Sequence, residues 1–584
     1  MRRRLALHAL AALALVALTL ALYRVDLGLG FFDLDDASYV TANPWIAGAS
    51  WAHLRFVLTE PYFGSYAPAQ LLAYMADFAW AGLDPRFFHL SSNLWAGLCA
   101  AGVYAVGVAL FGRSLPAFAA ALLFAAHPAH VEAVAWISSR KDLVAAGFGL
   151  PVIAAYLSSR RGGPRPRAWY ALSVALFLPA LAGKLSVATV PAILLGFDLL
   201  VERRRGAALW LDKLPYAALV AFFALRAAAA APSPRVEPQA FVAGHSLLQS
   251  LWLLGGFGDY VVARDAPARG AAVALQVAWS AGALLCAALP FGFARRLPGL
   301  ALALWAWIVL ALAPPLAASL VHPVADRYLF LPSAGLALLL AFAGMRAAER
   351  WPRHAPLALA AGALLLGLWT RGTRAYLAEW GDPRSLWFSA ARKSSDPEVR
   401  AYLGGHYLDC ADALDRADRR EASRALAELE WVGDPRLSSL LDELARGDVG
   451  SSTRAFQLHL REQAGVRLAQ ALLAKGDRVM PNLYLQLGKL SLDRGELDHA
   501  LEWFGTASNE AERHSLASYR AEQRALAAYD IGGVYRAKGD WVQAVSWIAY
   551  AEKLQRDAGG SWLPGVAEER HELERRCHCA APSY

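Results

Sequence analysis

Three aspartates stand just after the first apolar stretch of the sequence, in FFDLDDASYV. Asp33, Asp35 and Asp36 would lie at the edge of the hydrocarbon and beside one another, where burial and like charge both raise the pKa of a carboxylate. Such a carboxylate can take a proton from a hydroxyl nucleophile, so these aspartates are candidates for a catalytic base. The alternative is a solvated acidic loop that only helps to set the topology.

A second group of ionisable residues occupies HPAHVEAVAWISSRKDL, namely His127, His130, Glu132, Arg140, Lys141 and Asp142. Adjacent cations suit a phosphate group, so we expect Arg140 and Lys141 to bind one and the other four residues to line the site. The two histidines, three positions apart, suit a metal with Glu132, but no HExxH or further ligand signature supports a divalent ion and we predict no metal site. Residues that anchor a helix end at the membrane surface are the remaining alternative.

A third group, His322, Asp326, Arg327 and Tyr328, lies in VHPVADRYLFLPSAG. Arg327 could clamp a lipid-linked phosphate, with the neighbouring three side chains lining the same site. Alternatively, Asp326 and Arg327 only neutralise each other and Tyr328 is an aromatic of the membrane interface. Lys184, in LAGKLSVATVP, is a further candidate for phosphate binding.

Apolar runs must position these groups, because 57% of the 584 residues are hydrophobic and only 18% are charged. Residues 1–380 hold 30 Lys and Arg and 18 Asp and Glu, whereas residues 381–584 hold 27 and 31. We therefore predict an all-α protein with an integral-membrane domain over 1–380 and a soluble domain over 381–584. The positive excess lies among apolar runs, which excludes a nucleic-acid binder, and five cysteines exclude a disulfide scaffold.

The membrane domain is predicted to be a polytopic bundle of about eleven spans. The first is a retained signal anchor near the N-terminus, and the later apolar runs lie at 87–111, 115–127, 143–157, 168–183, 185–200, 214–231, 271–290, 299–320, 333–345 and 355–370. If the N-terminus is cytoplasmic, the inner breaks carry 17 Lys and Arg, as the positive-inside rule requires. We expect a multi-pass protein of a bacterial inner membrane, with the three candidate groups and the C-terminal domain in the periplasm.

Two segments of the soluble domain align with each other, YLQLGKLSLDRGELDHALEWF and AYDIGGVYRAKGDWVQAVSWI. Gly488, Gly495 and Ala500 match Gly532, Gly539 and Ala544 with a constant offset of 44 residues. Small residues at the first and third positions let two helices approach closely, and the middle glycine suits the turn between them. The pattern is typical of tetratricopeptide (TPR) repeats, although their usual period is about 34.

Five segments form a more distinctive set: LDDASYVTANPWI, YAPAQLLAYMADFAWAGLDPRFFHLSSNLWAG, HPAHVEAVAWISSRKDL, KLSVATVPAILLGFDLL and ADRYLFLPSAG. Followed by a repeat domain, they resemble the transmembrane-and-TPR O-mannosyltransferase family. The resemblance implies the C-type glycosyltransferase fold and a polyprenyl-phosphate sugar as donor. It also implies an aspartate base at Asp35 or Asp36 and phosphate contacts from Arg140, Lys141, Lys184 and Arg327. Leu185 departs from the family, whose eukaryotic members tend to carry an acidic residue there.

The expected function is transfer of a hexose, mannose by the resemblance, from a lipid-linked donor to an outward-facing acceptor such as a protein Ser or Thr hydroxyl, with inversion at the sugar. The expected partners are membrane lipid, the polyprenyl-phosphate sugar and a protein acceptor held by the repeats, with no nucleic acid and no certain cofactor. Two alternatives stay open: a non-catalytic membrane scaffold for envelope assembly, and a transporter of a lipid-linked saccharide.

Overall fold

The computed structural model of the chain describes residues 2–32, 34–161, 165–230, 240–265, 272–317, 322–381, 383–415, 451–514 and 516–582. Within these ranges the protein is helical and has no β-strand, with one isolated bridge between Tyr62 and Ser65. The all-α prediction is confirmed. Asp33 lies outside the described residues.

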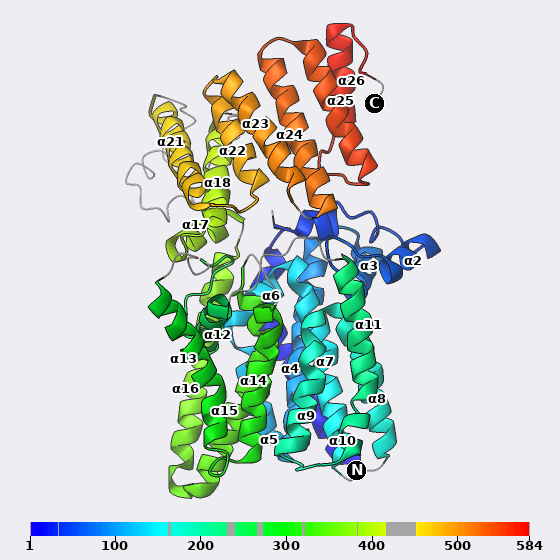
Figure 1. Cartoon of the computed structure of the whole chain (residues 1–584), viewed down its shortest axis with the longest axis vertical. Helices are drawn as coiled ribbons and strands as arrows, with labels where there is room; N and C mark the ends of the chain where they lie inside the picture. Colours follow the sequence, from blue (N-terminus) through cyan, green and yellow to red (C-terminus); the bar gives the residue numbers. More distant parts are fainter. Residues whose placement is uncertain are drawn as a thin grey trace.

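Long apolar helices pack side by side into a bundle that forms the lower part of the molecule in Figure 1. Its helices are α1 (Arg2–Tyr23), α4 (Pro85–Phe111), α5 (Ser114–Ala125), α6 (Val131–Ala135), α7 (Arg140–Arg160), α8 (Pro166–Gly183), α9 (Val190–Leu200), α10 (Ala207–Leu211), α11 (Leu214–Ala230), α12 (Ala240–Leu253), α13 (Val273–Gly292), α14 (Gly299–Ala317), α15 (Phe330–Arg350) and α16 (Ala355–Glu379).

Each predicted apolar run coincides with a helix of this bundle. In the described part of the chain, eight helices are long and apolar enough to cross a membrane, or nine if α5 and α6, bent by 56° at Pro128, form one broken span. The first of the eight is Leu5–Gly28, the predicted anchor. The helical membrane bundle is therefore confirmed, whereas α8 and α9 stay below the length or hydropathy of a clear span.

Local sequence signals set the ends and the close packing of these helices. Asp84 caps α4 by accepting a hydrogen bond from the backbone N–H of Arg86, and Gly112, with φ +65°, ends the helix in the left-handed conformation. Inside α4, a Cβ at Gly107 would lie 2.9 Å from Ala117 of α5. Residues without side chains at such positions let the helices approach to backbone contact.

The first loop after α1 folds over one end of the bundle. It contains a π-helical turn, Ala37–Thr41, followed by α2 (Trp51–Thr59) and α3 (Pro68–Ala81), drawn in blue at the top right of the bundle in Figure 1. Tyr39, Val40 and Ile46 form a small core with α3. The aspartates of this loop are thus held on a packed platform.

The C-terminal helices stack above this end of the bundle (Figure 1). They are α17 (Pro383–Lys393), α18 (Pro397–Asp415), α21 (Ser451–Ala474), α22 (Pro481–Asp493), α23 (Leu497–Glu512), α24 (Ala517–Ala537), α25 (Trp541–Asp557) and α26 (Val566–Cys577). The N-terminus of the chain lies at the opposite end of the bundle. The predicted domain boundary at residue 380 falls just after α16.

The two aligned segments form the helix pairs α22–α23 and α24–α25. A Cβ at Gly488 would lie 2.4 Å from Phe504, and one at Gly532 would lie 2.7 Å from Ile548. Gly495 and Gly539 occupy the turns with φ +73° and +77°. These four glycines therefore lie where the alignment predicts, two at helix contacts and two in left-handed turns.

Candidate active site

Three segments that are far apart in the sequence meet at the end of the bundle beneath the repeats. They are the loop with Asp35 and Asp36, the start of α7 after the 3₁₀ turn Ile137–Ser139, and the 3₁₀ turn Asp326–Leu329 before α15. Hydrogen bonds between Asp36 and Ser138 join the first two, and the charge of Arg327 in the third acts on Asp35, so the sequence-predicted groups converge on one region. Some of their side chains, however, are buried and paired within the fold, whereas others remain partly exposed at the site.

Asp36 is fully buried and its carboxylate is held by three donors. It accepts hydrogen bonds from the backbone N–H of Phe32 at 2.9 Å and of Ser138 at 3.0 Å, and from the Ser138 hydroxyl. Burial raises its pKa to about 6, although these hydrogen bonds oppose the shift. Asp36 thereby ties the first loop to the start of α7.

Asp35 is only half-buried, and in the described part of the chain its carboxylate accepts no hydrogen bond. Burial raises its pKa, while the positive charges of Lys141 and Arg327 oppose the rise. Asp35 therefore lies within electrostatic reach of both cations, which come from two other segments. Of the two predicted bases, it alone presents an unengaged carboxylate to this region.

Arg140 does not face Asp35. Its guanidinium is fully buried, forms an ion pair with Asp77 of α3, and donates to Ser92 Oγ at 3.1 Å and to the Phe88 carbonyl at 2.5 Å. Lys141, by contrast, is half-buried and its Nζ lies 5.3 Å from the centre of the Tyr39 ring. Of this predicted cationic pair, only Lys141 is placed to meet a ligand beside Asp35.

Arg327 is anchored by Glu132 of α6. The buried Glu132 carboxylate accepts from the Arg327 backbone N–H at 2.8 Å and pairs with its guanidinium. The guanidinium also lies 5.2 Å from the centre of the Trp136 ring and remains partly exposed. Glu132 thus orients this arginine and does not itself face a ligand.

Lys184 and Asp142 form a second pair next to Arg327. Lys184 Nζ lies 2.7 Å from both oxygens of Asp142 and 5.0 Å from the centre of the Tyr328 ring. The Tyr328 ring in turn lies 5.1 Å from the Arg327 guanidinium. Arg327, Tyr328, Lys184 and Asp142 therefore form one contiguous group.

Asp326 and Arg327 do not neutralise each other. Asp326 is fully buried and accepts from Arg264 at 2.8 Å, from the Val261 N–H at 2.9 Å and from the Tyr376 hydroxyl at 3.1 Å. It joins the turn before α15 to the segment after α12 and to α16. Neither Arg264 nor Tyr376 belongs to a motif, so no signal in the sequence pointed to either partner of Asp326.

His127 and His130 are core residues. The Nε2 of His127 lies 3.0 Å from the Leu254 carbonyl, and that of His130 lies 2.7 Å from Ser333 Oγ. Both side chains are buried, and their rings contact Trp369 of α16 and Phe330 of α15, respectively. The structure therefore does not bring these histidines to the site-lining position expected for them.

His322 meets the start of the repeat domain. Its Nε2 lies 2.8 Å from Glu398, and one ligand atom from each of His322, Asp396 and Glu398 falls within 4.8 Å of the others. That set could hold a cation, but Asp396 already pairs with Arg478 at 2.8 Å and with the N-terminus of α18. We assign these residues as ion pairs that join the two parts of the chain.

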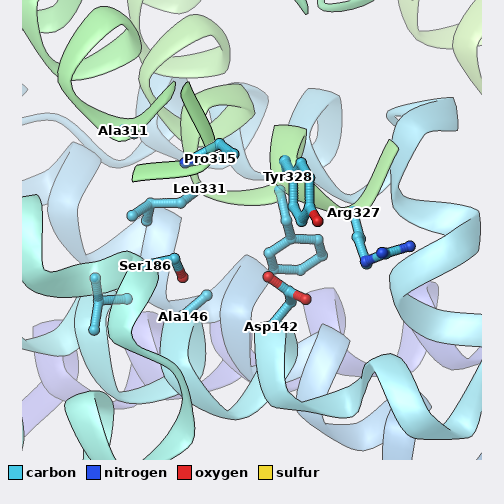
Figure 2. Close-up of a pocket in the computed structure, with 10 residues that line it drawn as sticks. Asp142, Ala146, Ser186, Ala311, Pro315, Arg327, Tyr328 and Leu331 are labelled. Carbon is cyan, nitrogen blue, oxygen red and sulfur yellow. The ribbon is translucent and has the colours of Figure 1, made fainter. Parts of the chain in front are cut away.

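A small cavity of about 20 Å³, room for about one water molecule, lies beside the Arg327 group. Figure 2 shows Asp142, Tyr328 and Arg327 on one side of it and Ala311, Pro315 and Leu331 on the other. Its wall is thus charged at one end and apolar at the other, where α14 and α15 pass into the bundle. The cavity is far smaller than a typical ligand pocket, so its lining marks only a place where charged and apolar side chains meet.

The repeat domain also contributes to this region. The Ser38 hydroxyl donates to Glu522 of α24 at 3.4 Å, and the charges of Glu522, Glu398 and Asp35 all raise the pKa of Tyr519, which burial raises most. No motif in the sequence had singled out Glu522, Tyr519 or Glu398. Only the folding of the repeats back onto the first loop reveals them.

Known proteins with similar sequences are protein O-mannosyl-transferases. The chain is 35% identical over 190 residues to Tmtc2 of Drosophila melanogaster, which covers 31% of this chain and 20% of that protein. It is 31% identical over 171 residues to TMTC2 of Mus musculus and 30% identical over 171 residues to TMTC2 of Homo sapiens, each covering 28% of this chain and 20% of the relative. The chain thus spans about a fifth of the length of these relatives.

The matches confirm the relationship to the transmembrane-and-TPR O-mannosyltransferases that the five sequence segments indicate. No protein-family profile matches the chain, and no solved structure matches it. The similarity to these relatives and the apolar helix bundle together identify a membrane protein.

Proposed function

From its relationship to the transmembrane-and-TPR O-mannosyltransferases, we propose that this protein is a membrane glycosyltransferase. It moves a hexose, mannose, from a polyprenyl-phosphate donor to an outward-facing hydroxyl acceptor, a Ser or Thr side chain of a protein. One observation carries the proposal: Asp35, Lys141 and Arg327, from three separate segments, lie within electrostatic reach of one another at one end of the bundle.

Asp35 is the proposed base. Its carboxylate is free of hydrogen bonds within the described residues, and its raised pKa makes it a better proton acceptor than an ordinary aspartate. Asp36, engaged by three donors, positions the loop that carries it. The acceptor O–H bond breaks as Asp35 takes the proton, and the acceptor oxygen attacks the anomeric carbon.

Lys141 and Arg327 are the proposed phosphate contacts. As the bond between the anomeric carbon and the phosphate oxygen breaks, negative charge grows on the leaving lipid phosphate, and cations fixed beforehand stabilise that charge. Lys184, held by Asp142, extends this positive edge towards the small cavity of Figure 2, and the apolar side chains around that cavity would lie next to the first part of the lipid chain. Attack opposite to the leaving group inverts the configuration at the sugar.

The proposed location is a bacterial inner membrane, with a cytoplasmic N-terminus and periplasmic repeats. The N-terminus and the candidate site lie at opposite ends of the bundle, and the basic loops lie at the end with the N-terminus. The site and the repeats would therefore both face the periplasm, where a lipid-linked donor and secreted acceptors meet.

The test uses the full-length protein in detergent or nanodiscs, polyprenyl-phosphate mannose and a Thr-containing peptide. We expect Asp35→Asn to lower the transfer rate by about a hundredfold or more, because general-base catalysis is worth about that much. Asp36→Asn should lower the melting temperature while leaving the folded fraction measurably active. Equal transfer by the wild type and Asp35→Asn would contradict the assignment of the base. A parallel series with EDTA should give unchanged rates, since no step uses a metal.

A further inference from the structure

Helix α24 of the repeat domain packs directly on the loop that carries Asp35. Gly64, in the turn between α2 and α3, has φ +70°, and a Cβ there would lie 2.1 Å from Cδ2 of Leu516, the residue before α24. Nearby, Ser38 donates to Glu522. In Figure 1 the lower end of α24, in orange, reaches the blue loop at the top of the bundle. The first turns of α24 therefore cover the loop next to Asp35.

Glu522 lies on the side of α24 that faces the site. It is half-buried, and burial raises its pKa to about 7, with the charge of Asp35 adding to the rise. Tyr519, one turn earlier and so on the same face, is within electrostatic reach of Glu522, Glu398 and Asp35. The carboxylates of the repeat domain and of the first loop thus lie close enough to interact electrostatically.

Some charges in this region have a partner of opposite sign and others do not. On the membrane side Arg327 pairs with Glu132, and on the repeat side Glu398 pairs with His322. Glu522 forms no ion pair within the described ranges, and its recorded partner there is the Ser38 hydroxyl. Partial burial without a cation disfavours the ionised form of this carboxylate, and a positively charged ligand group beside it would favour that form and gain affinity here.

We propose that α24 forms the acceptor subsite of the enzyme and that Glu522 binds a Lys or Arg side chain next to the acceptor Ser or Thr. This inference rests on the proposed function, since it assigns the acceptor class of the same site. Glu522 is a positioning residue: it holds the acceptor segment while Asp35 takes the proton. In this proposal the repeats do more than recruit a partner, because α24 itself contacts the acceptor segment that carries the Ser or Thr.

The test compares three synthetic peptides that hold one Thr flanked by Lys, Gln or Glu, with polyprenyl-phosphate mannose as donor. For the wild type we expect kcat/KM of the Lys peptide to exceed that of the Glu peptide about tenfold or more, mainly through KM. Glu522→Gln should bring the three peptides within about threefold of one another, and Glu522→Lys should reverse their order. Glu572→Gln, an exposed glutamate of α26, is the matched control and should keep the wild-type order.

The outcomes separate this inference from the proposed function. Transfer by the wild type with the same peptide order in Glu522→Gln and Glu522→Lys would overturn the role of Glu522 and leave the transferase proposal standing. Loss of transfer to all three peptides in Glu522→Gln, with an unchanged melting temperature, would also overturn it, because charge selection spares the Gln peptide. No transfer by the wild type to any peptide would instead contradict the proposed function itself.

Discussion

Arg140 and Lys141 are consecutive residues whose charged groups lie in different surroundings. The Arg140 guanidinium is buried against Asp77 of α3, whereas the Lys141 ammonium lies over the Tyr39 ring within reach of Asp35. Because successive side chains of a helix point in directions about 100° apart, the first turn of α7 can serve the core with one cation and the site with the next. The pair thus joins a structural contact to a candidate ligand contact.

Replacing Arg140 should lower the stability of the protein. Arg140→Gln leaves the Asp77 carboxylate buried without its cation, which costs about 3–5 kcal/mol in comparable pairs. We expect a clear fall in melting temperature for the protein in detergent. The double variant Arg140→Gln/Asp77→Asn should be more stable than the sum of the single effects predicts. Lys141→Gln is the matched control, and a melting temperature as low as that of Arg140→Gln would contradict the distinction.

The pH dependence of transfer should report the pKa of Asp35. The base works only when ionised, so activity is lost as the pH falls through its pKa, which burial raises above the ordinary 3.8. Lys141→Gln removes a charge that lowers this pKa, so the acid limb of kcat/KM should move to higher pH. Glu398→Gln removes a charge that raises it, so the limb should move to lower pH.

The control for these profiles is Glu572→Gln, which lies on the exposed side of α26 and should leave the acid limb unchanged. The essential result is that the acid limb moves in opposite directions in Lys141→Gln and Glu398→Gln. A loss of stability alone would move the acid limb of both variants in the same direction. If the Lys141 and Glu398 variants shared one acid limb with the wild type, the group seen in the profile would not be Asp35.

Removing Arg327 should affect transfer and stability separately. Arg327→Gln takes away a cation next to the leaving phosphate, and the loss of one such fixed group costs about a hundredfold or more in rate. It also leaves the buried Glu132 without its partner. The double variant Glu132→Gln/Arg327→Gln should recover melting temperature but not transfer, measured with the same donor and peptide. If the double variant recovered transfer as well as stability, Arg327 would only stabilise the fold and would have no role at the leaving phosphate.

Two adjacent glycines of α24 should respond in opposite directions. A Cβ at Gly532 would lie 2.7 Å from Ile548 of α25, so Gly532→Ala should destabilise the repeats by about 1–3 kcal/mol. Gly533 has nothing within 4 Å of such a Cβ, so Gly533→Ala should stabilise the helix by up to about 1 kcal/mol. Chemical unfolding followed by circular dichroism measures both. Equal effects would contradict the close contact between α24 and α25.

Features of the fold that depend on local sequence were predictable. Apolar runs located the bundle helices, and the glycines around Gly488 and Gly532 located the helix pairs, because length, hydropathy and side-chain size act within a few residues. The number of clear membrane spans was less accessible, since α8 and α9 are apolar enough to pack inside a bundle but short or broken by proline.

The roles of individual charged residues could not be read from their neighbours in the sequence. Arg140 and Lys141 look alike as a pair, and Asp35 and Asp36 do too, yet in each pair one member is bound to distant partners and the other is not. Asp77 and Ser138 decide these roles, and they lie 63 and 102 residues away from Arg140 and Asp36 in the sequence. The family resemblance limited the candidate site residues to a few sequence segments. Only the fold shows which residues of each segment face the site and which are bound in the core.

The contact of Leu516 with Gly64 limits what residue 64 can be. A Cβ there would lie 2.1 Å from Cδ2 of Leu516, so any larger residue would push the start of α24 away from the loop that carries Asp35. The spacing between the repeat domain and this loop therefore depends on a glycine.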